Sequence, residues 1–403
     1  HMRPGQVWRN VAVLVMAQAV LGSQMTMQFI AGGLVGQVLT PWPCIATLPI
    51  SVMILGSTLS ARPLARFMAR HGRQMGFTLA AGMGAVGGLI SFLGIHYGSF
   101  WIYVAGTFVS GTYMAAQGFY RFAAVDGADP KLHGKAISAV MAGGLAAGVL
   151  GPWLTNATRE ALGIPFLGTY AGIIAINVIG PPLFAMLHQP PRPVMDSPAA
   201  RVPHLRLSDL MRRPPVVVAM ICALVSYALM NLVMTSTPLA MMGCGLSGAD
   251  TSFVVGAHVL SMYLPSFFTG HLIARLGTAR MVGIGMLILT LAGLVALTGV
   301  ELEHFTITLV LLGVGWNFGY IGATTMLTRA QRPHEREALQ GLNDMIVFGG
   351  VFVASLASGG LLNCSGTTAR MGWNLVNMAM LPFLLLAAGA LIWLSLRGRR
   401  AEV

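Results

Sequence analysis

Charged side chains are scarce in this sequence. Only 9% of its 403 residues are Asp, Glu, Lys or Arg, whereas soluble globular domains contain about 25%. So few charges cannot cover a folded chain of this length with a hydrated surface, and the mean hydropathy of +0.73 agrees. The composition therefore excludes a soluble enzyme. The sequence also lacks a nucleotide-binding glycine-rich loop and any nucleophile paired with a base, so we expect no enzymatic activity and no prosthetic group.

Cysteine and acidic residues are also few. The four cysteines are too few for a disulfide scaffold, and the sequence alone does not determine whether any pair is oxidised. The 12 acidic residues are outnumbered by 24 Lys and Arg, which gives a net charge of +12. In a soluble protein this excess would suggest nucleic acid as a partner, but the positions of the basic residues point elsewhere.

Nearly all basic residues lie in alternate connections between apolar segments. These connections are 62–73, 121–135, 188–213, 275–280, 329–337 and the two termini. The opposite side keeps only Arg159 and Arg370. This bias follows the positive-inside rule and predicts that both termini are cytoplasmic. We therefore expect the lipid bilayer, and not nucleic acid, as the partner of this basic chain.

Twelve apolar segments of about 20 residues, the length that spans a bilayer as a helix, follow one another along the chain. They cover 11–38, 44–61, 75–95, 99–120, 136–154, 165–187, 216–240, 251–273, 281–300, 306–328, 339–362 and 373–396. Outer-membrane β-barrels instead use alternating segments of about 10 residues. The sequence thus predicts an all-α polytopic protein with twelve transmembrane helices, located in the bacterial inner membrane.

A proline-rich basic stretch divides these segments into two sets of six. We expect an N-terminal bundle at 1–187, a cytoplasmic linker at 188–215 and a C-terminal bundle at 216–403. A short repeat supports this division, since Ala69-Arg-His-Gly72 and Ala274-Arg-Leu-Gly277 follow the second segment of each set. Such internal symmetry is typical of transporters built from two related halves.

These features resemble the major facilitator superfamily. Its degenerate signature Gly-x-Leu-x-Asp-Arg-x-Gly is matched best by the stretch from Gly270 to Gly277. Both copies carry alanine (Ala69 and Ala274) where the superfamily usually has Asp, which places the usual charge contact between helices in doubt. The resemblance implies two pseudo-symmetric six-helix bundles, secondary transport by alternating access, and a monomer.

Methionine is the most over-represented residue type, with 26 copies. Met230 and Met234 are four residues apart in one segment, and His258 and Met262 are four apart in the next. Residues at this spacing share a helix face, and in antiparallel helices the two pairs lie at equal depths. Thioether and imidazole groups suit copper, especially the reduced ion. The alternative is that these methionines pack helices and that His258 bonds to a backbone carbonyl.

The same two motifs resemble those of the CcoA-like copper importers within the superfamily. The resemblance implies that Met230, Met234, His258 and Met262 bind a copper ion as transported substrate. It further implies copper uptake into the bacterial cytoplasm, supply of copper for assembly of a haem-copper (cbb-type) cytochrome oxidase, and a copper chaperone as a partner. This is the main functional interpretation of the sequence.

Secondary candidates accompany these four residues. Two cysteines near equivalent ends of the halves are weaker candidates for metal contact, as are two methionines in the first segment. Membrane carboxylates couple protons in related transporters, so three charged residues are candidates for that role, although the sequence favours an ion pair or helix cap at the cytoplasmic end over proton coupling. The candidates are Cys44, Cys244, Met25 and Met27 for the metal, and Asp344, Asp126 and Arg121 for the proton.

Two other functions compete with copper import. A transporter of an organic solute, such as riboflavin or a drug, would use an aromatic and polar cavity, for which the sequence offers Tyr113, Gln117, Tyr227, Trp316 and Asn317. The stretches Gln117 to Phe122 and Gly315 to Phe318 look like the wider family, to which riboflavin transporters also belong, and so do not discriminate between the two cargoes. A metal sensor or assembly factor without transport is the third possibility, and the lack of a soluble domain argues against it.

Overall fold

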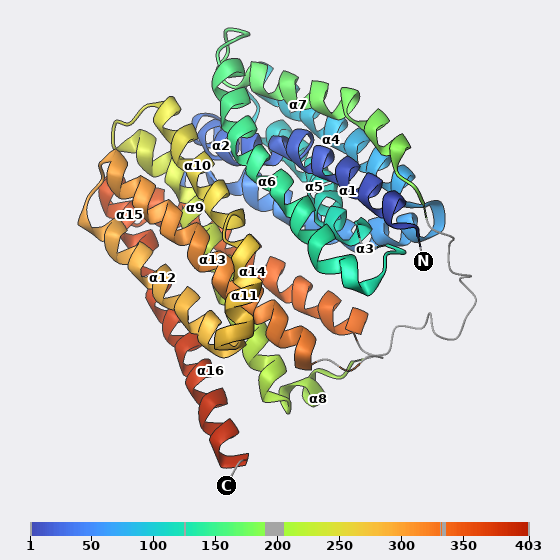
Figure 1. Ribbon diagram of the computed structural model, residues 1–403. Helices are drawn as coiled ribbons and strands as arrows, with labels where there is room; N and C mark the ends of the chain where they lie inside the picture. Colours follow the sequence, from blue (N-terminus) through green and yellow to red (C-terminus); the bar gives the residue numbers. More distant parts are fainter. Residues whose placement is uncertain (1, 125, 190–204, 331, 333–335, 402–403) are drawn as a thin grey trace.

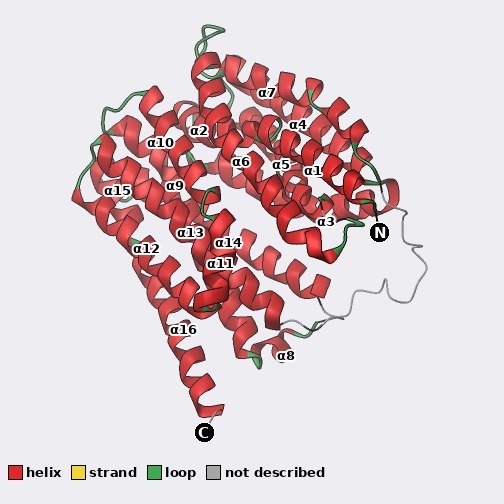
Figure 2. Ribbon diagram, in the orientation of Figure 1, coloured by secondary structure: helices red, strands yellow, loops and turns green. Residues whose placement is uncertain are grey.

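The computed structural model describes residues 2–124, 126–189, 205–330, 332 and 336–401, and it is helical throughout, without a strand in those ranges (Figures 1 and 2). The first half contains α1 (Pro4–Val20), α2 (Ser23–Leu39), η1 (Pro43–Ile45), α3 (Leu48–His71), α4 (Arg73–His96), α5 (Phe100–Ala123), α6 (Pro130–Thr158), α7 (Leu167–Ile179) and η2 (Pro181–Met186). The second contains α8 (Leu207–Met211), α9 (Pro214–Gly243), α10 (Gly248–Tyr263), α11 (Ser266–Leu276), α12 (Thr278–Thr298), α13 (Leu302–Ala330), α14 (Arg336–Cys364), α15 (Ala369–Met378) and α16 (Met380–Ala401).

Each of the twelve predicted segments coincides with one helix or with one interrupted pair of helices. Within the described residues, nine helical stretches are long and apolar enough to cross a membrane, and α10 with α11 makes a tenth across a bend of 43°. The segments predicted at 99–120 and 136–154 coincide with α5 and α6. Helices satisfy every backbone hydrogen bond internally, which is why apolar segments in lipid adopt them. The predicted all-helical membrane fold is confirmed.

The sequence repeat has a structural counterpart. Gly72 ends α3 and begins α4 with φ 90° and ψ 164°, and Gly277 ends α11 and begins α12 with φ 87° and ψ 161°. These positive φ values disfavour any residue with a Cβ atom. The two short repeats therefore encode the same sharp turn between two helices, once in each half.

The buried apolar residues form separate clusters in the two halves. One cluster, here called the N-terminal core, draws on α1–α6 and η2, and includes Leu14, Phe77 and Tyr120. The larger C-terminal core is built mainly from α9 and α12–α16, with four residues of α2, α3 and the connection between them added. In Figure 1 the blue-to-green helices and the yellow-to-red helices accordingly form two groups. Most of the predicted linker, residues 190–204, lies outside the described residues.

Direct bonds join the two halves at one end of the bundle. We call it the distal end; it holds the connections near residues 40–47, 97–99, 159–166, 244–247 and 365–368, and lies opposite the N-terminus (Figure 1). There Thr47 Oγ1 donates to the carbonyl of Ser355 at 2.8 Å, and Ser51 Oγ lies 2.7 Å from Ser355 Oγ. A disulfide between Cys44 and Cys364 closes the same contact covalently.

Glycine residues, which lack a Cβ atom, allow α4 and α5 to pack in close contact. A Cβ at Gly106 would overlap the backbone N and Oγ of Ser91. We therefore expect Gly106→Leu to force the helices apart and to lower the free energy of unfolding by about 1–3 kcal/mol or more. Thermal unfolding in detergent measures this. Gly82→Leu on α4 is the matched control, because nothing lies within 4 Å of its Cβ position; equal losses in both variants would contradict the packing argument.

Candidate functional site

Aromatic side chains gather on the second half and form the candidate site. The ring of Tyr227 on α9 meets Trp316, Tyr320 and Phe348 at centroid distances of 5.5, 5.0 and 5.2 Å, each in an edge-on arrangement. Trp316 and Tyr320 stack at 5.5 Å with an interplanar angle of 15°. Tyr263 adds a fifth ring, 6.3 Å from Trp316. We call these five residues the aromatic cluster.

The positions of these rings follow from helix geometry. Trp316 and Tyr320 are four residues apart on α13 and therefore share one face. Tyr227 on α9 and Phe348 on α14 reach that face from neighbouring helices. Edge-on and offset-stacked rings attract each other through their quadrupoles, so the five rings hold one another in a fixed arrangement.

Trp316 also carries an unused polar group. Its side chain is buried, and its Nε1 has no hydrogen-bond partner among the described residues. A buried donor without an acceptor costs about 1–3 kcal/mol, and such groups call for a specific explanation. A solute that supplied an acceptor next to the ring would remove this cost.

The cluster borders the first half of the protein. A Cβ at Gly144 on α6 would lie 3.1 Å from Cδ2 of Tyr263, so the α6 backbone rests against this ring. Phe29 on α2 and Met114 on α5 pack against the C-terminal core as well. One turn after Met114, on the same helix face, Gln117 has a buried Oε1 without a partner in the described part of the chain. The α6 backbone at Gly144 thus meets the Tyr263 ring of the cluster across the boundary between the halves.

Two of the predicted cavity residues have structural roles instead. Tyr113 is fully buried in the N-terminal core, and its hydroxyl lies 3.2 Å from that of Tyr120. Asn317 donates to the carbonyl of Met262 at 2.6 Å and to Ser266 Oγ at 2.8 Å, and accepts from Thr269 Oγ1 at 2.6 Å. Neither side chain is available to a solute in this arrangement.

The role of Asn317 arises from the break between α10 and α11. Pro265 lies at the break, where proline removes a backbone donor and clashes with the preceding turn. In an unbroken helix the carbonyl of Met262 would accept from residue 266. Asn317 supplies that missing donor from α13, so one amide holds both sides of the bend.

Asn317→Leu is expected to destabilise the protein by about 2–3 kcal/mol. The change removes three hydrogen bonds and leaves the buried carbonyl of Met262 without a donor, which carries the full desolvation cost. Thermal unfolding in detergent measures the loss, with Asn156→Leu on the exposed face of α6 as the control. An unchanged transition temperature for Asn317→Leu would show that another group satisfies the break.

The four residues predicted to bind copper are all buried in the second half. Met230, Met234 and Met262 belong to the C-terminal core. His258 Nδ1 donates to the carbonyl of Leu309 on α13 at 2.8 Å, the alternative considered for this histidine, while Nε2 has no partner among the described residues. No group of three or more His, Cys, Asp or Glu side chains in the described ranges could hold a metal. A role for these four side chains as ligands stays a prediction.

The secondary metal candidates lie apart from one another. Cys44 forms the disulfide with Cys364, and Cys244 is a half-buried free thiol. Burial raises the pKa of the Cys244 thiol, an effect that nearby Arg370 partly offsets, so without a metal this group has less thiolate character than a free cysteine. Met25 lies in the N-terminal core, whereas Met27 packs with Tyr103 in a separate cluster near the distal end.

The proton-coupling candidates lie near the end opposite the distal end. Asp126 accepts from Arg73 Nε at 2.7 Å, and both side chains are partly exposed, so the pair contributes about 0–1 kcal/mol. Asp344, two turns into α14, accepts from Asn343 Nδ2 at 3.3 Å. The side chain of Arg121 lies outside the described residues. Proton coupling through these groups stays a prediction.

Comparison with known proteins identifies the family. The sequence profile of the Major Facilitator Superfamily matches residues 12–355 and 219–403. The chain belongs to the major facilitator superfamily. Among its relatives is the riboflavin transporter RfnT of Brucella anthropi (strain ATCC 49188), which is 38% identical over 98% of both chains. YddS of Bacillus subtilis (strain 168), described as an uncharacterized MFS-type transporter, is 27% identical over 96% of this chain and 90% of its own.

Solved structures show the same fold. The nucleoside transporter NupG has a TM-score of 0.74 and 14% identity over 96% of this chain and 98% of its own. A bacterial homologue of the human lysosomal transporter Spinster has a TM-score of 0.71 and 15% identity over 97% of each chain. The family match and the apolar helices together make this chain a multi-pass membrane transporter.

Copper import, the main interpretation of the sequence, is wrong by this comparison. The relative that matches 98% of the chain at 38% identity is a riboflavin transporter and not a copper importer. The predicted supply of copper for cytochrome oxidase assembly depends on copper import and is therefore wrong as well. The physical reason lies in the motifs. Methionine pairs at helical spacing arise readily among 26 methionines, and thioethers fill apolar cores as well as they bind metals.

Of the five residues of the aromatic cluster, only Tyr227 and Trp316 are among the predicted cavity residues. Tyr263, Tyr320 and Phe348 are not among them. The spacing of Trp316 and Tyr320 could have indicated Tyr320, since two aromatic residues four apart share a face. No sequence signal connects Tyr263 or Phe348 to them, because they lie on other helices.

Proposed function

We propose that this superfamily member transports riboflavin, or a solute with a comparable planar ring system, by alternating access between its halves. The observation that supports this most is the similarity to RfnT along the whole chain. The aromatic cluster adds a chemical reason, because stacked and edge-on rings bind a flat conjugated solute through its π-face. We further propose uptake across the bacterial inner membrane with both termini cytoplasmic, as the distribution of basic residues predicts.

Two buried polar groups, one on each half, suit the rest of such a solute. A flavin ring carries carbonyl and nitrogen acceptors along its edge, and its ribityl chain carries hydroxyl groups. Trp316 Nε1 is a buried donor for an edge acceptor, and Gln117 Oε1 is a buried acceptor for a hydroxyl group. Ligand sites commonly combine an apolar lining with a few such polar groups.

A riboflavin-auxotrophic bacterium without its own riboflavin uptake tests the proposal. Cells that express the Cys364→Ser variant, in which the disulfide between the halves cannot form, should grow on micromolar riboflavin and accumulate radiolabelled riboflavin, and an excess of unlabelled riboflavin should compete. Cells that carry the empty vector should do neither. Correctly inserted protein that gives neither growth nor accumulation would overturn the proposal.

A further inference from the structure

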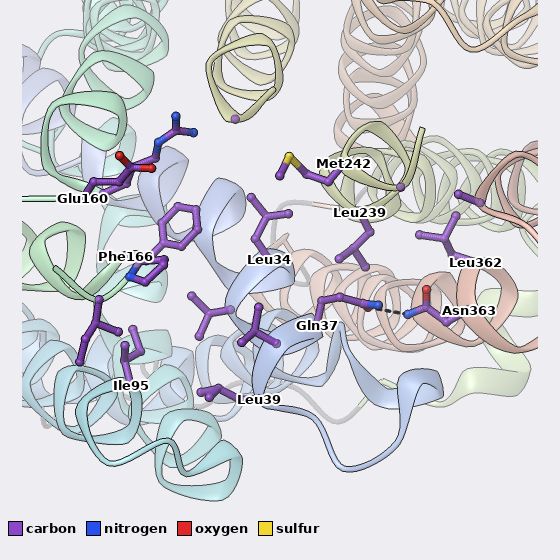
Figure 3. Close-up of a pocket in the computed structure, with 18 of the residues that line it drawn as sticks. Leu34, Gln37, Leu39, Ile95, Glu160, Phe166, Leu239, Met242, Leu362 and Asn363 are labelled. Carbon is purple, nitrogen blue, oxygen red and sulfur yellow. Dashed lines mark hydrogen bonds between the residues drawn. The ribbon is translucent and has the colours of Figure 1, made fainter. Parts of the chain in front are cut away.

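A second candidate site lies at the distal end, away from the aromatic cluster. A cavity of about 830 Å³ opens between the halves there, within the range of about 300–1,000 Å³ typical of small-molecule sites. Its walls come from the end of α2, the α6–α7 connection, the end of α9 and the α14–α15 connection. We call it the distal cavity (Figure 3).

The distal cavity is closed on its inner side by contact between the halves. Leu34 on α2 and Leu239 on α9 both line it and belong to the C-terminal core. Next to Leu34, a Cβ at Gly33 would lie only 3.7 Å from Cγ of Leu239. On another wall Asn363 donates to Gln37 Oε1 at 2.9 Å, the bond drawn in Figure 3. A solute that arrived from the distal side would therefore stop here until the halves separate.

Phe166 provides an aromatic surface in this cavity. Its φ of 66° is the only positive value at a non-glycine residue in the described ranges, a conformation that a bulky side chain rarely adopts. Its backbone N–H donates to the carbonyl of Arg159 at 2.7 Å, which closes the loop between them. The side chain packs against residues of both halves, and in Figure 3 its ring faces toward Leu34. Strained residues of this kind concentrate at functional sites.

Arg159 adds a charged donor at the same cavity. Its side chain is half-buried and has no hydrogen bond or ion pair within the described part of the chain. A Cβ at Gly248, the first residue of α10, would overlap its guanidinium, so the group rests directly on that helix end. Arginine there is not stabilised by the helix dipole, which favours anions at an N-terminus. Guanidinium groups donate several hydrogen bonds and also stack on aromatic rings, so a ring with edge acceptors suits this position.

We propose that the distal cavity is a first binding site for the transported solute, with its planar ring against Phe166 and an edge acceptor on the guanidinium of Arg159. This inference rests on the proposed transport of riboflavin and deepens it. The solute binds at the distal cavity while the halves are in contact, and it passes to the aromatic cluster when they separate. The protein accordingly has two sites of the same ligand chemistry at different depths.

Equilibrium titration of the purified full-length protein in lipid nanodiscs tests this, with quenching of riboflavin fluorescence as the signal. With the Cys44–Cys364 disulfide reduced, the otherwise unchanged protein should bind two equivalents of riboflavin. Phe166→Ala and Arg159→Gln should each lose the equivalent bound at the distal cavity and keep the one bound at the aromatic cluster. Trp316→Ala should lose the equivalent at the aromatic cluster and keep the one at the distal cavity.

In uptake assays Phe166→Ala should raise KM about tenfold and leave the maximal rate within about twofold, because the aromatic cluster is unaffected. Leu162→Ala, on the same connection but exposed and outside the cavity lining, is the matched control.

A labelling experiment keeps the inference testable even if those variants do not fold. Met242 lines the cavity and is 45% exposed, so Met242→Cys in a Cys244→Ser background should react with a maleimide. Riboflavin should slow that reaction at least fivefold, and should not slow it at Leu162→Cys in the same background. If the protein binds only one equivalent of riboflavin and Phe166→Ala still binds it, the distal site is overturned while transport stands. Labelling of Met242→Cys at an unchanged rate in saturating riboflavin would overturn the distal site in the same way. No binding and no uptake by the protein with its Cys44–Cys364 disulfide reduced would instead overturn the proposed function.

Discussion

Replacing Trp316 by alanine is expected to lower the kcat/KM of riboflavin uptake about 30-fold, which corresponds to about 2 kcal/mol. The change removes the largest ring of the aromatic cluster, worth about 0.5–1.5 kcal/mol per aromatic contact beyond its buried area. It also removes the buried Nε1 donor that has no partner in the described structure, worth about 0.5–1.5 kcal/mol when bonded to a solute. Uptake of radiolabelled riboflavin at equal amounts of inserted protein measures the effect.

A conservative substitution separates the two contributions. Trp316→Phe keeps a ring but lacks the indole donor, so we expect a loss of about fivefold, between the alanine variant and the unchanged protein. Trp153→Ala on α6, where the side chain is 63% exposed, controls for the loss of a tryptophan from a membrane helix. Full uptake by Trp316→Ala would place the solute away from the aromatic cluster.

Oxidation of Cys44 and Cys364 is expected to block transport. Their disulfide joins α14 to the connection before α3 at the distal end, and alternating access requires the halves to move apart there. In proteoliposomes the oxidised protein should take up riboflavin at least about tenfold more slowly than the same protein after treatment with a reductant, because a covalent bond prevents the second conformation from being populated. The oxidised and reduced fractions are quantified by alkylation of free thiols.

Single substitutions separate this bond from the other cysteines. Without any reductant, Cys364→Ser should transport as fast as the unchanged protein does after its disulfide is reduced. The hydrogen bonds from Thr47 and Asn363 that still join the halves are reversible. Cys222→Ser and Cys244→Ser, which remove the two free thiols, should still require the reductant. Equal rates for oxidised and reduced protein would mean that the solute passes without separation of the halves at this contact.

Much of the fold could be predicted because its determinants are local. Each apolar segment of about 20 residues specifies a helix by its length and composition, and the matching turns at Gly72 and Gly277 follow from two four-residue repeats. The interruptions were not predicted. The sequence suggested one continuous helix at 251–273, whereas Pro265 breaks it and Asn317, distant in sequence, holds the bend.

The functional site was predicted only in part, for a physical reason. Trp316 and Tyr227 were named from their chemistry, but the same reasoning named Tyr113 and Asn317, whose polar groups are bonded within the protein. Side chains of one type in one environment can line a cavity or satisfy a buried partner, and composition does not distinguish these outcomes. The methionine and histidine pairs illustrate this as well, since their spacing shows a shared helix face but not what that face contacts.

The sequence by itself determined that this chain is a helical membrane protein, where its helices run, and that its two halves share a turn motif. These properties depend on the hydropathy and local geometry of neighbouring residues, and both are read directly along the chain. Only the tertiary structure decided that Cys44 pairs with Cys364, that five rings from α9, α10, α13 and α14 form one cluster, and that a cavity lies between the halves at the distal end. Contacts between residues hundreds of positions apart depend on how whole helices pack, and helix packing is set by the shapes of all facing side chains together.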